Sequence, residues 1–294
     1  MTTVATLRSA LSWSAVQLPA DPATGSIALR FAQVDGGASG PSVTITCGIH
    51  GDEGPWGALA VQRVLERPLS ELKGRLQLVL AANPTSVAAD TRCSPLDQLD
   101  LNRCFPGSDT GSHSERLAAA LADVVAGSDV LIDLHGGGSW CVNAFTFRFP
   151  GSESLADAVG APFVVDRPLG SGNLAGHVAA AGTRVVAIEM GGRSVAEMAW
   201  RDRLADGVER VLTVAGSLPK RLPDPSAATP SRTSASCGRA SAACSYPWCA
   251  RATSARWWPR ARCWAWCTTW PPWNRWSRSA HPSRRPHSSW SDRT

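Results

Sequence analysis

The sequence predicts an α/β fold in which a mixed, mostly parallel β-sheet carries helices on both faces. Two observations lead to this prediction. Short runs rich in β-branched and apolar residues recur along the first 225 residues, and segments with apolar residues at helical spacing separate them. Such alternation is typical of sheets that helices cover on both faces. Ligands of these folds bind beyond the carboxyl ends of the strands.

The first strands are expected over residues 26–34 and 42–49, which turn-forming Gly and Pro residues separate. Pro55 then stands where a first helical residue is favoured. Apolar residues at helical spacing continue from there, so we expect a helix that runs to about Arg67.

The next three elements repeat the alternation. A buried strand is expected over residues 75–82. Ser112 and Glu115 have the spacing of a capping box, which predicts that a helix begins there. A further strand is expected over residues 129–134, after this helix.

The last strand and helix of this region follow the same logic. An apolar strand is expected over residues 184–190, where it meets two glycines. Ser194 and Glu197 form a second predicted capping box. The helix that they open is expected to end at Gly216, because glycine favours the conformation that ends a helix.

Charge and composition divide the chain into two regions, which we place at residues 1–225 and 226–294. From Ser231 onward there are eleven Arg, one Asp and no Lys or Glu, a net charge of +10, so the preceding part carries −5 of the total of +5. An acidic body argues against nucleic-acid binding by the main domain, because phosphate contacts need clustered Lys and Arg. No apolar stretch approaches the roughly 18 residues of a membrane span, so we expect no membrane partner.

The C-terminal tail does not have the composition of a folded domain. It contains no Val, Leu, Ile or Met after residue 230, yet it holds nine of the thirteen Trp and five of the nine Cys. Aliphatic side chains supply most of an ordinary core, so such a segment cannot build one. We hypothesise that the tail is translated in a shifted reading frame of a GC-rich gene. A disordered tail of ordinary origin is the alternative.

A zinc finger is a third interpretation of the tail. Cys263, Cys267, His281 and His287 come close to the spacing of a two-Cys, two-His site. Such fingers need apolar residues between the ligand pairs, and the Trp-Pro-Pro-Trp run found there would break a helix. We therefore favour the other two interpretations.

A metal site is expected at the strand ends of the body. His50 and Glu53 lie three residues apart in a strand-to-helix turn, where both side chains can reach one ion, and His135 ends a later strand. Two His and one Glu are a known catalytic zinc set that leaves one position for water. Asp133, two residues earlier, is expected to point to the same side of its strand as His135. It either orients a neighbouring group of the site or is a buried carboxylate that has its own hydrogen-bond partners. Glu53 alone could be an ordinary helix-start acid, but its conjunction with the other motifs favours the metal site.

Six motifs resemble, in the same order, those of the succinylglutamate desuccinylase/aspartoacylase family, a branch of the zinc carboxypeptidase fold. They are GIHGDE, AANP, DLNRCFPG, SERLA, DLHGG and IEMGG, and they span about residues 40–215. The resemblance implies a zinc carboxypeptidase-like fold and one zinc ion per chain, held by His50, Glu53 and His135. It also implies that Glu189 is the general base that activates the attacking water.

The resemblance implies roles for three further residues. Arg92 corresponds to the arginine that stabilises the oxyanion, with a solvated loop residue as the alternative. Asn102 and Arg103 correspond to the pair that grips the substrate's carboxylate, a task to which a planar guanidinium is suited. A surface salt bridge is the alternative for this pair. Related enzymes continue into a β-rich part where this chain has its tail, so no substrate contact is carried over to Tyr246.

We therefore expect a cytoplasmic, zinc-dependent hydrolase that cleaves the amide bond of an N-acyl amino acid. A metallocarboxypeptidase acting on peptides and an inactive metal-binding remnant are the alternatives. The expected partner is the small-molecule substrate, with no nucleic acid and no membrane, while a homo-oligomer stays open. Binding to nucleic acid or anionic surfaces is suggested only by the Arg-rich end. The four cysteines of the body lack a pairing rhythm, which fits reduced thiols.

Overall fold

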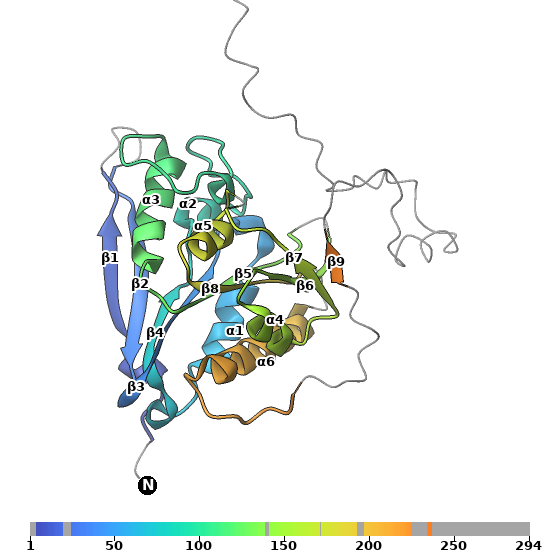
Figure 1. Ribbon diagram of the computed structural model, residues 1–294. Helices are drawn as coiled ribbons and strands as arrows, with labels where there is room; N and C mark the ends of the chain where they lie inside the picture. Colours follow the sequence, from blue (N-terminus) through green and yellow to red (C-terminus); the bar gives the residue numbers. More distant parts are fainter. Residues whose placement is uncertain are drawn as a thin grey trace, which may run out of the picture. The chain divides into compact units, whose positions relative to one another are not determined.

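A computed structural model of the chain describes residues 4–19, 25–138, 141–170, 172–192, 197–224 and 234–236. The described residues belong to the unit Met1–Arg239 and are built around one sheet with the strand order β1-β2-β4-β3-β5-β8-β6-β7-β9 (Figure 1). The strands are β1 (Ser12–Gln17), β2 (Ala28–Asp35), β3 (Ala38–Cys47), β4 (Lys73–Val79), β5 (Val130–His135), β6 (Asn143–Arg148), β7 (Phe163–Asp166), β8 (Arg184–Gly191) and β9 (Ser234–Ser236). The helices are α1 (Trp56–Val64), α2 (Pro84–Ala89), α3 (His113–Val125), α4 (Glu153–Val159), α5 (Leu174–Ala180) and α6 (Glu197–Ala215).

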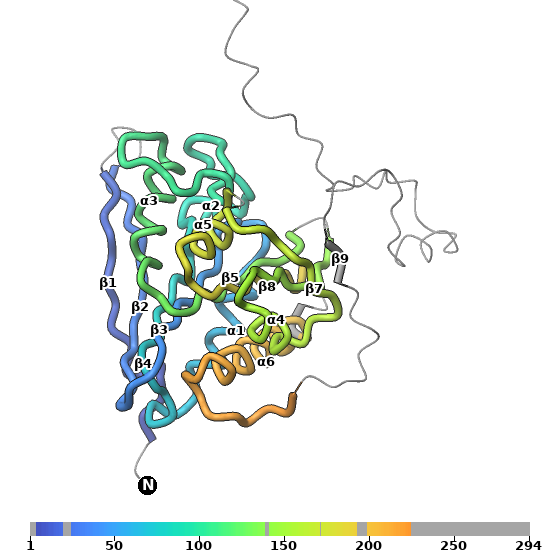
Figure 2. The backbone as a smooth tube through the Cα atoms, in the orientation of Figure 1, coloured from blue at the N-terminus to red at the C-terminus, as the bar shows by residue number. Residues whose placement is uncertain are grey.

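The centre of the sheet is parallel. β4, β3, β5 and β8 run in one direction, whereas β1, β2 and β6 each pair with a neighbour in the antiparallel sense. The mixed, mostly parallel sheet predicted from the sequence is therefore confirmed. The backbone tube shows that β3, β5 and β8 lie side by side although they come from distant parts of the chain (Figure 2). Their carboxyl ends consequently meet at one edge.

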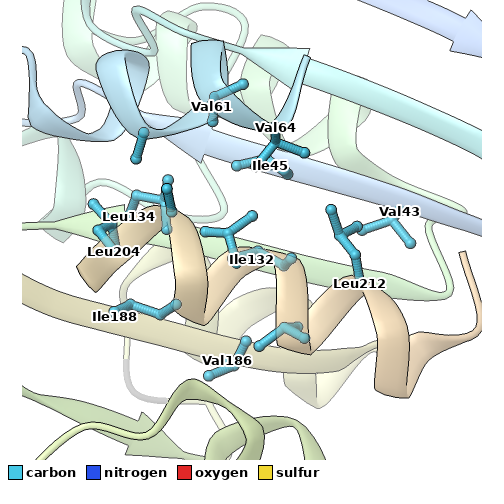
Figure 3. Packing of buried hydrophobic residues seen from close by; sticks show 14 of the residues in the cluster. Val43, Ile45, Val61, Val64, Ile132, Leu134, Val186, Ile188, Leu204 and Leu212 are labelled. Carbon is cyan, nitrogen blue, oxygen red and sulfur yellow. The ribbon is translucent and has the colours of Figure 1, made fainter. Parts of the chain in front are cut away.

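Helices cover both faces of the sheet, as predicted. On one face α1, α4 and α6 pack against alternate strand residues, and the labelled side chains of Figure 3 belong to this cluster: Val43, Ile45, Val61, Val64, Ile132, Leu134, Val186, Ile188, Leu204 and Leu212. On the other face α3 and α5 pack against the intervening positions, among them Leu131, Val185 and Ala187. Neighbouring residues of β5 and β8 therefore face opposite sides of the sheet.

Local sequence signals explain where two of the helices begin and end. At the start of α3, Ser112 Oγ accepts a hydrogen bond from Glu115 N, and the Glu115 carboxylate accepts one of 2.8 Å from Ser112 N, so the predicted capping box is confirmed. α6 stops before Gly216, whose φ of +92° is the conformation that glycine adopts readily. Ser194, of the second predicted capping box, lies outside the described residues.

The structure also contains elements that the sequence did not predict. These are the strands β1, β6, β7 and β9 and the short helices α2, α4 and α5. β1 is exposed along its whole length, so it lacks the apolar alternation by which half-buried strands are recognised. α1 ends at Val64, slightly before the expected limit at Arg67.

Of the predicted tail, the structure describes only Ser234–Ser236, which form β9 and pair with β7. The cysteines and histidines of the zinc-finger interpretation, and Tyr246, lie outside the described residues, as does the rest of the tail after Ser236. Within the ranges given above, no helix is both long enough and apolar enough to cross a bilayer.

Candidate metal centre

The ends of three parallel strands bring the expected site residues together. His50 follows β3, His135 is the last residue of β5, and Glu189 lies opposite His135 in the register of β5 and β8. Leu134 and Ile188 point toward the α1 and α6 side of the sheet (Figure 3). Because side chains alternate along a strand, His135 and Glu189 point to the opposite side together.

Glu53 connects the two histidines. It lies on the 3₁₀ turn Gly51–Glu53, directly after His50. Its Oε1 atom is 2.6 Å from His50 Nδ1, and its Oε2 atom is 3.1 Å from His135 Nδ1. All three side chains are buried, and one ligand atom from each lies within 4.8 Å of the other two.

The spacing and the donor types fit a metal ion. The ligand atoms of a tetrahedral site are about 3.4 Å apart when each bond to the ion is about 2.1 Å long. The Nδ1 to carboxylate distances of 2.6 and 3.1 Å are close to this value, so small movements would place the three ligand atoms around one ion. Two imidazole nitrogens and one carboxylate oxygen are a common set of protein metal ligands.

Two further carboxylates contact the outer nitrogens of the histidines. Asp100 Oδ1 is 3.0 Å from His50 Nε2, and Asp133 Oδ2 is 3.0 Å from His135 Nε2. Asp133 also accepts a hydrogen bond of 2.6 Å from Thr46 Oγ1. This buried carboxylate therefore contacts a proposed metal ligand and also has another hydrogen-bond partner. Such contacts favour the Nε2–H tautomer, in which Nδ1 is the nitrogen that can bind an ion.

The charges of the cluster compensate one another. Burial acts to lower the pKa of both imidazoles. The negative charges of Glu53 and Asp100 outweigh burial at His50 and raise its pKa. Those of Asp133 and Glu53 do the same at His135. Burial acts in the opposite sense on Glu53, where the two histidines outweigh it and lower the pKa of the carboxyl. The cluster therefore favours an ionised carboxylate, which is the form that binds a metal, and it also favours protonated imidazoles, whose protons a bound ion would displace.

Arg92 lies beside this cluster. Its Nε and Nη2 atoms are 3.1 and 3.0 Å from Asp100 Oδ2, and its Nη1 atom is 3.8 Å from Glu53 Oε1. The guanidinium is about one-third exposed, at 32%. Arg92 thus lies in a loop and sets a positive charge next to the buried Glu53.

Glu189 has one side-chain hydrogen bond among the described contacts. Its Oε2 atom accepts a hydrogen bond of 2.8 Å from Asn143 Nδ2. Burial raises the pKa of the Glu189 carboxyl, Glu53 adds to this effect, and His135 only partly opposes it. A carboxyl with a raised pKa is suited to take up and return a proton near neutral pH.

Asn102 and Arg103 lie on the 3₁₀ turn Leu101–Arg103. Asp100 caps the start of this turn, because its carboxylate accepts a hydrogen bond of 2.9 Å from Asn102 N. Asn102 Oδ1 accepts a hydrogen bond of 3.0 Å from Leu174 N at the start of α5. The Arg103 side chain is exposed, and its Nη1 atom donates to Asn102 O at 2.9 Å. The turn thus presents an exposed guanidinium, whose positive charge helps to lower the pKa of Asp100 after His50 and Arg92.

Sequence reasoning missed two residues that contact the expected machinery. Asp100 stands in the same DLNR motif as Asn102 and Arg103, so its motif gave a signal that could have found it. Asn143 gave none, because it begins a strand that was not predicted and its contact with Glu189 depends on the pairing of β6 with β8.

The body of the chain is similar in sequence to proteins of one family. Residues 39–215 match the family model of the succinylglutamate desuccinylase/aspartoacylase catalytic domain, which is more than half of the chain. Over 101 residues the chain is 42% identical to N-alpha-acetyl-L-2,4-diaminobutyric acid deacetylase from Halomonas elongata, and this stretch covers 34% of the chain and 29% of that protein.

Solved structures show the same fold. A succinylglutamate desuccinylase/aspartoacylase from Rhodobacter sphaeroides is 26% identical, with a TM-score of 0.62 over 71% of this chain and 66% of that one. The product-bound ectoine utilization protein EutE (DoeB) from Ruegeria pomeroyi is 24% identical, with a TM-score of 0.62 over 72% of this chain and 69% of that one. The chain thus spans about two-thirds of these structures and less than a third of the Halomonas protein.

Proposed function

Because the chain belongs to the succinylglutamate desuccinylase/aspartoacylase family, we propose that it is a zinc-dependent hydrolase that cleaves the amide bond of an N-acyl amino acid. The buried cluster of His50, Glu53 and His135 is the observation that carries this proposal. The deacetylase from Halomonas, which acts on an N-acetylated amino acid by its name, supports the same substrate class.

The donor set favours zinc. His50 and His135 would bind it through Nδ1 and Glu53 through its carboxylate, which leaves a position for water. Zinc, when bound, lowers the pKa of a water molecule and polarises the amide carbonyl. Asp100 and Asp133 would hold the imidazoles in orientation through their contacts with Nε2.

The residues around the cluster can carry out the remaining steps. Glu189 would take a proton from the water as the water oxygen bonds to the carbonyl carbon. The positive charge of Arg92 would stabilise the oxyanion that forms. Glu189 would then return the proton to the amide nitrogen as the carbon–nitrogen bond breaks, which yields a free amine and a carboxylic acid that releases its proton to water. Asn102 and Arg103 would bind the carboxylate of the amino acid.

A hydrolysis screen of the full chain tests the proposal. The substrates are amino acids carrying acetyl, succinyl or aspartyl groups, together with short peptides, each with and without a chelator. We expect chelator-sensitive release of the amine from at least one acylated amino acid. Glu189→Gln should keep about one zinc per chain and lose turnover by roughly 100-fold or more. Well-folded, zinc-loaded protein that cleaves none of these amides would contradict the proposal, and cleavage of peptides alone would identify a carboxypeptidase.

A further inference from the structure

Asn143 is the first residue of β6, and its side chain reaches the neighbouring strand β8. The two strands are antiparallel, with Asn143 opposite Gly191 and Phe145 opposite Glu189. From this position the Asn143 Nδ2 atom donates the 2.8 Å hydrogen bond to Glu189 Oε2. The contact joins the proposed general base to a residue that no motif of the sequence singled out.

The surroundings of Asn143 show which end of its side-chain amide carries the NH₂ group and which carries the oxygen. A carboxylate accepts hydrogen bonds and donates none, so the NH₂ group must be the end that faces Glu189. The Oδ1 atom lies 3.6 Å from the thiol of Cys141, which can donate weakly to it. The amide therefore has a donor end toward Glu189 and an acceptor end toward Cys141.

We propose that Asn143 is a positioning residue for Glu189. It holds Oε2, which leaves Oε1 to take the proton from the attacking water. The amide is neutral, so it adds no positive charge beside the carboxylate, although its hydrogen bond acts to lower the pKa of Glu189. This inference rests on the proposed function, because it assumes that Glu189 is the general base.

The chain offers a matched control on the same pair of strands. Thr146, three residues along β6, is fully buried, and its Oγ1 atom donates a 2.8 Å hydrogen bond to Ala187 O of β8. Thr146→Val and Asn143→Leu each remove one hydrogen bond between β6 and β8 while keeping the size of the side chain. The two variants differ in whether the lost bond ends on Glu189.

The experiment measures kcat, KM and zinc content of the full chain for both variants. Asn143→Leu should lower kcat by about tenfold or more, with KM within about twofold of the wild type and zinc content unchanged, because misplacing a catalytic group is costly. Thr146→Val should keep kcat within about twofold. Asn143→Asp, which sets a second carboxylate against Glu189, should also lower kcat. In a Glu189→Gln background, Asn143→Leu should cause little further loss, since it acts through the missing base.

Equal kcat values for Asn143→Leu and Thr146→Val, or a fall in kcat that follows loss of zinc, would overturn the inference. Crystal structures of the two zinc-loaded variants separate this outcome from a failure of the proposed function. If the wild type cleaves no amide but the Glu189 carboxylate moves only in Asn143→Leu, the proposed function fails and the positioning contact stands. A Glu189 carboxylate that keeps its place in Asn143→Leu refutes the inference whatever the activity.

Discussion

Asp100 holds the outer nitrogen of His50, with its Oδ1 atom 3.0 Å from His50 Nε2. The same carboxylate pairs with Arg92 through its second oxygen, at 3.0 and 3.1 Å. Burial acts to raise the pKa of the Asp100 carboxyl, but His50 and Arg92 outweigh it and lower this pKa. Asp100 is therefore an ionised link between a proposed metal ligand and the proposed oxyanion-binding arginine.

Asp100→Ala should weaken zinc binding by about 10- to 100-fold, the usual effect of removing the outer partner of a metal-bound histidine. Competition with a chromophoric chelator measures the affinity. Asp100→Asn is the matched variant, because its amide oxygen can still accept from His50 Nε2 while its NH₂ group replaces the oxygen that accepts from Arg92. Equal affinities for Asp100→Ala and the wild type would show that the contact does not support the ligand.

Zinc should stabilise the folded chain, since a ligand that binds the native state alone raises the free energy of unfolding. At a free zinc concentration about 1,000 times the dissociation constant, the gain is about 4 kcal/mol. Thermal unfolding with and without a chelator measures the shift in Tm. His50→Ala should lose this response, and a shift of full size in His50→Ala would remove His50 from the ligand set.

Leu212→Ala should cost about 2 to 5 kcal/mol of unfolding free energy, because Leu212 is fully buried between α6 and the sheet (Figure 3). Val214 lies on the same helix but is 46% exposed. Val214→Ala should therefore change stability by no more than about 0.5 kcal/mol. Urea denaturation of both variants tests the contrast, which disappears if α6 does not pack as described.

Asp97 should make stability depend on pH in the acid range. Its carboxylate accepts hydrogen bonds of 2.7 and 2.8 Å from Ser114 N and Oγ, and one of 3.2 Å from Leu99 N. Partial burial raises the pKa of Asp97, but these hydrogen bonds outweigh burial and keep it below its ordinary value of 3.8. A lowered pKa contributes stability above that ordinary value, and the contribution is lost as the pH falls through the lower, folded value.

Asp97→Asn should accordingly be less stable than the wild type at pH 6, and the gap should narrow once the pH drops below about 4. Urea midpoints measured between pH 3 and 6 give the comparison. A gap that stays constant over this range would mean that the carboxylate is not the group responsible.

The strongly patterned elements could be predicted from the sequence. The second half of β3 and the strands β5 and β8 are mostly buried and end at glycine or histidine motifs, and α3 begins with a capping box that forms as expected. β1 is exposed throughout, and α4 and α5 have seven residues each, too few for two turns of apolar spacing. Their existence depends on packing against the rest of the sheet, which a local pattern does not contain.

The site divides in the same way. His50, Glu53, His135 and Glu189 stand in short motifs at strand ends, so their meeting follows from the order of parallel strands. The contacts of Asp100 with His50 and of Asn143 with Glu189 depend on separations of 50 and 46 residues along the chain. Only the folded sheet shows which side chains meet over such distances.

The alternation of β8 has a consequence for how this protein can change by mutation. Ile188 and Met190 pack into the core on the α1 and α6 side, and Glu189 between them faces the other way. Deleting or inserting a single residue early in β8 would reverse these orientations and turn a methyl or thioether group toward the histidines. A substitution at one position of β8 leaves the neighbouring side chains facing the same sides, whereas a change in the length of the strand would remove the proposed activity even in a chain that still folds.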